Sequence, residues 1–121
     1  MTDTTAPSHL LIGAWELVSG SYLGDDGVLI DYEAAGIKSL KVLSETRFSF
    51  VTTAKGAFYA AGGGDYTAEN GKYAEMPRLA SHDSMLGQRF EFDFLLDGDM
   101  WTNTRWRGDV QVEHEVWKRA G

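Results

Sequence analysis

Apolar and polar residues alternate along most of this chain with a period of two, which is typical of β-strands that bury one face. The clearest case is the segment 88–96, where Phe90, Phe92 and Phe94 alternate with charged residues and should form one apolar face. Similar patterns recur along the chain. The sequence therefore predicts about eight strands, at residues 15–23, 38–42, 47–53, 58–67, 72–79, 88–96, 100–107 and 110–119.

Short turn sequences separate these segments. Asn70-Gly71 is the strongest hairpin signal, because both residues tolerate a positive φ angle. Residues 80–87 have weak strand character and predict a loop or a single helical turn. Because successive hairpins need no long crossover, we predict an all-β fold, a single up-and-down antiparallel β-barrel rather than a Greek-key sandwich.

Composition limits the protein's partners and its location. The 121 residues correspond to one domain, with a flexible N-terminal arm at 1–10 and the barrel at 11–121. The net charge of -7 disfavours binding to nucleic acid and to anionic membranes. There is no cysteine, and we recognise neither a secretory signal nor a membrane-spanning stretch, so we expect a cytoplasmic protein. The sequence leaves open whether it forms a homodimer.

The first and last segments of the predicted barrel domain resemble sequences of a known family. Gly13-Ala14-Trp15 is similar to the Gly-X-Trp opening of lipocalins and the wider calycin group, and Trp117-Lys118-Arg119 supplies the basic residue expected near the end. With the glycine run 62–64, the chain after residue 10 resembles bacterial lipocalin-like domains. The resemblance implies that Trp15 closes one end of the barrel against Arg119. The glycines themselves predict either a bend or bulge in the strand or a close contact with a ligand.

One candidate for acid–base chemistry is His114. It shares strand parity with the apolar Val112 and Val116, so we expect it to face inward, either as a hydrogen-bonded core histidine or as a ligand-binding or proton-transfer group. Its neighbours Glu113 and Glu115 point to the opposite face and cannot share a metal ion with it. No phosphate-binding loop or zinc-binding helix motif occurs, and we expect neither a metal nor a cofactor.

Two strands present further polar groups beside aromatic ones. Tyr73 and Glu75 share one strand face, and an inward Glu75 would act as an acid or base with Tyr73 as a hydrogen-bond donor. Trp101, Asn103 and Arg105 share a face of another strand, where Arg105 would recognise an anionic oxygen. Alternation alone does not decide which of these faces is inward.

The predicted barrel favours binding of a small hydrophobic or aromatic molecule in its lumen. The predicted contacts are Phe48, Phe50, Tyr66, Phe90, Phe92, Trp101 and Asn103. The alternative is a cofactor-independent isomerase, cyclase or lyase that uses His114, Tyr73, Glu75 and Arg105. A third hypothesis is an interaction module whose lumen is packed solid. A pocket with several inward polar groups favours the enzyme, an apolar pocket favours a carrier, and no pocket favours the module.

Overall fold

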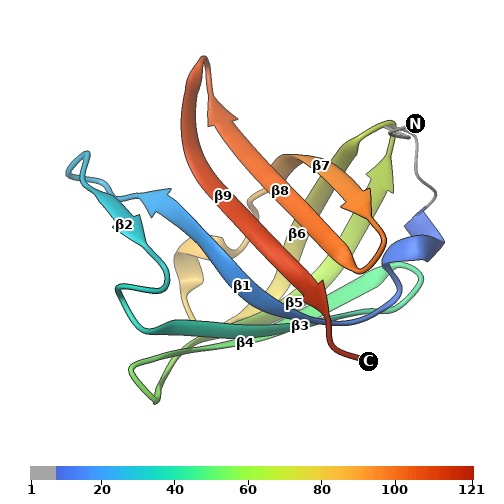
Figure 1. Cartoon of the computed structure of the whole chain (residues 1–121), viewed down its shortest axis with the longest axis horizontal. Coiled ribbons are helices and arrows are strands. Elements are labelled where there is room, and N and C mark those ends of the chain that lie inside the picture. The colour runs from blue at the N-terminus through green and yellow to red at the C-terminus, as the bar shows by residue number, and fades with distance from the viewer. Residues whose placement is uncertain (1–7) are drawn as a thin grey trace.

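The computed structural model describes residues 8–121, which form a closed antiparallel β-barrel (Figure 1). Strands β3 to β9 pair consecutively along the chain, β1 pairs with β3, and β1 also pairs with β9, which closes the barrel. The all-β, up-and-down fold predicted from the alternation is therefore confirmed. The strands are β1 (Gly13–Leu23), β2 (Leu29–Asp31), β3 (Ile37–Leu43), β4 (Arg47–Ala54), β5 (Ala57–Glu69), β6 (Lys72–Ala80), β7 (Phe90–Asp97), β8 (Met100–Arg107) and β9 (Val110–Arg119).

The structure differs from the predicted elements in detail. Eight strands form the closed barrel, and the short strand β2 lies beside the end of β1 as an extra edge (Figure 1). The weakly patterned segment 80–87 contains a short 3-10 helix, η2 (Asp83–Met85), and strand β7 starts two residues later than predicted. A second 3-10 helix, η1 (Ser8–Leu11), precedes β1. Of the predicted N-terminal arm, residues 1–7 lie outside the described part of the chain.

Glycines sit where the backbone turns or where strands approach closely. Asn70 and Gly71 have φ angles of 54° and 76° and form the predicted hairpin between β5 and β6. The register of that pair shifts between Gly63 and Gly64. A Cβ atom at Gly64 would overlap the carbonyl oxygen of Met76. The glycine run therefore lies opposite a bulge of β6 at Arg78, where the strands approach too closely for a side chain, so a bulge, one of the two interpretations, accounts for it.

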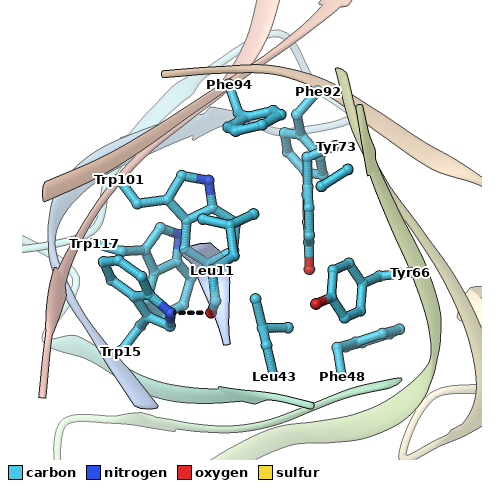
Figure 2. Close-up of a cluster of buried hydrophobic side chains, with 11 residues drawn as sticks. Leu11, Trp15, Leu43, Phe48, Tyr66, Tyr73, Phe92, Phe94, Trp101 and Trp117 are labelled. Atoms are coloured by element: carbon cyan, nitrogen blue, oxygen red, sulfur yellow. Dashed lines mark hydrogen bonds between the residues drawn. The ribbon is translucent and has the colours of Figure 1, made fainter. Parts of the chain in front are cut away.

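An aromatic core fills one end of the barrel (Figure 2). The Trp15 indole is fully buried, donates a hydrogen bond to the Leu11 carbonyl oxygen at 2.9 Å and packs edge-on against Trp101. The Arg119 guanidinium lies 4.3 Å from the Trp15 ring centroid and donates to the Leu10 carbonyl oxygen. The Trp15–Arg119 contact implied by the lipocalin resemblance is present, and it closes this end of the barrel.

The apolar faces of β4 and β7 point inward, as the alternation predicts. Phe48, Phe92 and Phe94 are almost completely buried in the aromatic core. Phe50 and Phe90 are partly buried and pack against that core from the other half of the lumen. The barrel interior thus changes along its axis, from a packed aromatic end to an end that is only partly filled.

Candidate ligand-binding site

A cavity of about 280 Å³ occupies the lumen beyond the aromatic core and is partly open to solvent. Its walls include aromatic rings from five strands and from the segment that follows β2. The barrel is therefore not packed solid, and the interaction-module hypothesis loses its premise. The aromatic lining consists of Tyr22, Tyr32, Phe50, Tyr59, Phe90, Phe92 and Trp117.

Ionisable side chains line the same cavity, which is unusual for the interior of a small barrel. They come from four different strands, and antiparallel pairing brings them together although they are far apart in the sequence. They are Lys41 on β3, Glu75 on β6, Arg105 on β8, and Glu113 and Glu115 on β9.

Lys41 and Glu75 form a buried ion pair at the inner end of the cavity. Their residues are 4% and 8% exposed, and 2.5 Å separates Lys41 Nζ from Glu75 Oε2. The Tyr73 hydroxyl donates to the same oxygen at 2.6 Å. Burial alone would lower the pKa of Lys41, but the carboxylates of Glu75 and Glu115 raise it above its ordinary value, so the lysine stays protonated. Its ammonium also lies 4.7 Å from the centroid of the Trp117 ring.

Tyr73 stays a hydrogen-bond donor in this cluster. Burial, followed by the charge of Glu75, raises the pKa of its hydroxyl well above the ordinary value. The face shared by Tyr73 and Glu75, which the sequence left undecided, is therefore the inward one. The same holds for Trp101, Asn103 and Arg105, since Trp101 and Asn103 are fully buried and Arg105 lines the cavity.

Glu113 is held by an arginine and a tyrosine. Arg105 Nε donates to Glu113 Oε1 at 3.0 Å, and the Tyr32 hydroxyl donates to Glu113 Oε2 at 3.0 Å. Burial and the charge of Glu113 raise the pKa of Tyr32 above its ordinary value, so this hydroxyl also remains a donor. The carboxylate of Glu113 thus accepts hydrogen bonds from one charged group, the Arg105 guanidinium, and one neutral group, the Tyr32 hydroxyl.

Among the described residues, the groups that donate hydrogen bonds to Glu115 are neutral, and its carboxyl group also lies within hydrogen-bonding reach of Glu113. Trp117 Nε1 and Asn103 Nδ2 donate to its Oε1 at 3.1 and 3.4 Å. Burial, followed by the neighbouring charge of Glu113, raises the pKa of Glu115 from 4.5 to about 7, although the charge of Lys41 acts in the opposite direction. Glu115 can therefore take up and release a proton near neutral pH.

The prediction that His114 faces the lumen is wrong. Glu113, Glu115 and Trp117 point inward from β9, so His114 lies on the opposite face, where its Nδ1 is 3.2 Å from the Thr104 hydroxyl. The prediction followed the valines of this strand instead of its last residues. Arg119 contacts the buried Trp15, and alternate residues of a strand share one face. Counting back from Arg119 in steps of two therefore places Trp117, Glu115 and Glu113 on the inner face, and this count could have been made from the sequence.

The structure divides the predicted ligand contacts into two groups. Phe50, Phe90 and Phe92 line the cavity, together with Glu75 and Arg105. The others are buried in or beside the aromatic core and do not line the cavity; the Tyr66 hydroxyl, for example, donates to the Ser44 carbonyl oxygen at 2.6 Å. This second group is Phe48, Tyr66, Trp101 and Asn103.

Sequence reasoning missed Lys41. On β3 the apolar Leu40 and Val42 are more than half exposed, whereas Lys41 is buried. Apolar residues are usually buried and lysines usually exposed, so the alternation on this strand predicts the opposite orientation. The sequence of β3 therefore gives no indication that Lys41 points inward.

The closed eight-stranded up-and-down barrel with an internal cavity is consistent with a lipocalin-like fold. In comparisons with known proteins, no family model and no curated protein sequence matches the chain. Within residues 8–121, no helix is long and apolar enough to cross a membrane. No group of three or more His, Asp or Glu side chains in that range is placed to hold a metal ion.

Proposed function

We propose that this protein is a lipocalin-like barrel that binds one small, largely apolar molecule in its lumen. The observation that carries the proposal is the cavity of about 280 Å³, with aromatic walls and ionisable groups at its inner end. Ligand pockets commonly combine apolar walls with a few placed polar groups, and this volume is at the small end of their range. A molecule with one or two rings and a single polar group fits both features.

A variant that fills the cavity tests this proposal. Ala60 lines the cavity from β5, whereas its neighbour Ala61 pairs with the exposed Val51 and faces outward. We expect Ala60→Phe to abolish binding of fused-ring aromatic probes in isothermal titration calorimetry. Ala61→Phe, the matched control, should leave binding unchanged.

Two results would contradict lumenal binding. One is that the wild-type protein binds none of the probes, and the other is that Ala60→Phe binds them as well as Ala61→Phe does. Native mass spectrometry of protein purified from its own host adds an independent readout. A retained small molecule that Ala60→Phe lacks would identify the ligand's mass.

A second candidate function is acid–base catalysis on the bound molecule. It is favoured by Glu115, whose pKa of about 7 suits a group that alternately accepts and donates a proton. In this proposal the Glu115 carboxylate removes a proton from a carbon next to a carbonyl group. N–H groups of Lys41 or Arg105 stabilise the enolate oxygen, and the proton returns to another carbon, which completes an isomerisation. Glu115 takes the role that the sequence analysis gave to His114.

Deuterium exchange tests this candidate without knowledge of the natural substrate. We expect an enolisable aromatic ketone such as tetralone to exchange its α-hydrogens for deuterium faster with the wild-type protein than with Glu115→Gln. Equal exchange rates, in the presence of equal binding, would leave the protein as a binder only.

A further inference from the structure

The lumen holds one more carboxylate than it holds cations. Among the described residues that line the cavity, the acidic groups are three glutamates and the basic groups are Lys41 and Arg105. Lys41 is paired with Glu75 at 2.5 Å, and Arg105 is paired with Glu113 at 3.0 Å. Glu115 is left without a cation of its own.

The surroundings of Glu115 have a surplus of acceptors. Within the described part of the chain, both hydrogen bonds that it accepts end on Oε1, and none ends on Oε2. The neighbouring Asn103 is fully buried, and its Oδ1 has no hydrogen-bond partner among the described residues. A buried acceptor without a donor costs free energy, so a ligand that brings donors to this place would gain from it.

Aromatic faces beside this carboxylate accept cations. The Lys41 ammonium lies over the ring of Trp117, the residue that donates to Glu115. Tyr32 and Phe90 line the same cavity. An anionic group among aromatic faces is the usual surrounding of a bound organic cation.

We propose that the ligand carries a protonated amine, whose N–H groups bind Glu115 at the inner end of the cavity while its apolar part lies against the aromatic walls. This inference rests on the proposed lumenal binding and specifies the chemical class of the ligand. A carboxylate ligand is disfavoured because both lumenal cations already have partners.

Proton linkage gives the two ligand classes opposite pH dependences. Burial and Glu113 raise the pKa of Glu115 to about 7, so the group is mostly neutral at about pH 6 and mostly ionised at about pH 8. An ammonium ligand should therefore bind up to about tenfold more tightly at pH 8 than at pH 6, whereas a carboxylate ligand should bind more weakly. The titratable and charged groups that face Glu115 from the packed elements are Glu113, Lys41, Arg105, Glu75, Tyr73 and Tyr32.

Three probes of one shape separate these possibilities. They are naphthylmethylamine, naphthylmethanol and naphthoate, titrated calorimetrically at pH 6 and pH 8 in two buffers of different ionisation enthalpy. We expect the amine to bind at least about tenfold more tightly than the alcohol at pH 8, because hydrogen bonds to charged groups are roughly twice as strong as neutral ones. At pH 6 its binding should release protons.

Glu115→Gln should remove this preference. We expect it to weaken amine binding by about tenfold or more and to change binding of the alcohol by less than about threefold. Glu16→Gln, an exposed carboxylate on the outside of β1, is the matched control and should bind all probes as the wild type does.

The outcomes distinguish the inference from the function on which it rests. If the alcohol or naphthoate binds as tightly as the amine, or if amine affinity does not rise with pH, the amine inference is wrong but lumenal binding stands. If no probe binds to the folded wild-type protein, lumenal binding fails as well. The pH dependence of the wild type tests the inference even if Glu115→Gln does not fold.

Discussion

The strongest test of the interior charges is Glu75→Gln, which removes one charge and keeps the size of the side chain. Lys41 and Glu75 are almost completely buried, and 2.5 Å separates Nζ from Oε2. Without the carboxylate, the Lys41 ammonium would lose its direct counter-charge while it remains out of water. Breaking a buried ion pair in this way costs about 3–5 kcal/mol of unfolding free energy.

Replacing both partners should cost much less. In the double variant Lys41→Met/Glu75→Gln no buried charge is left unpaired at this place, and the methionine packs against the rings of Trp117 and Tyr73. Buried pairs can often be exchanged for uncharged residues of similar volume with little loss. We therefore expect the double variant to be more stable than Glu75→Gln by at least about 2 kcal/mol.

Denaturant unfolding measures these differences. The experiment is best done at about pH 6, below the pKa of Glu115, so that loss of the lysine does not leave that carboxylate ionised. In thermal unfolding, each kcal/mol corresponds to about 3–5 °C for a domain of this size. Asp93→Asn is the control, because it breaks the exposed ion pair with Lys72 and should cost less than about 1 kcal/mol. The reasoning is refuted if Glu75→Gln costs no more than Asp93→Asn, or if the double variant is the least stable.

Three further predictions concern stability. The raised pKa of Glu115 means that the folded state binds this proton more tightly than the unfolded state, so unfolding free energy should fall by about 3 kcal/mol between about pH 4.5 and pH 7. Glu115→Gln should flatten this part of a pH series of urea unfolding curves, and an unchanged slope would contradict the assignment. Trp15→Ala should cost about 3–5 kcal/mol in the same assay, since it empties the closed end of the barrel; a loss under about 1 kcal/mol would argue against that role. Gly64→Ala should cost about 1–3 kcal/mol because its Cβ would meet the Met76 carbonyl, and a neutral effect would show that the bulge can relax.

Most of the fold could be predicted because its determinants are local. Alternation fixed which residues share a strand face, and the Asn70-Gly71 turn fixed a hairpin through positive φ angles. The strand Leu29–Asp31 was missed, since three residues are too few to show a period. It pairs with the end of β1 across the short turn 24–28, and its three residues do not show the alternation that marks the longer strands.

The site was harder to predict because alternation does not say which face is inside. Strand β8 carries Trp101 on one face and Trp106 on the other, and only barrel closure buries the first and leaves the second half exposed. The reversed placement of Leu40 and Lys41 on β3 has the same cause. Pairing of β1 with β9 closes the barrel and thereby determines which strand faces are inside. Trp15 and Arg119, which meet at this closure, are the residues in the sequence that indicate it.

The two ends of the lumen differ in the side chains that they bury, and this difference supports the proposed ligand-binding site. At the closed end, tryptophans, tyrosines and phenylalanines pack as they would in any stable core. At the other end, charged groups such as Lys41 and Glu115 are buried at a desolvation cost that an apolar filling would avoid. Departures from good packing concentrate where function requires them. Because the five buried or half-buried charges all line one cavity, the simplest physical reason for keeping them is a ligand that they recognise.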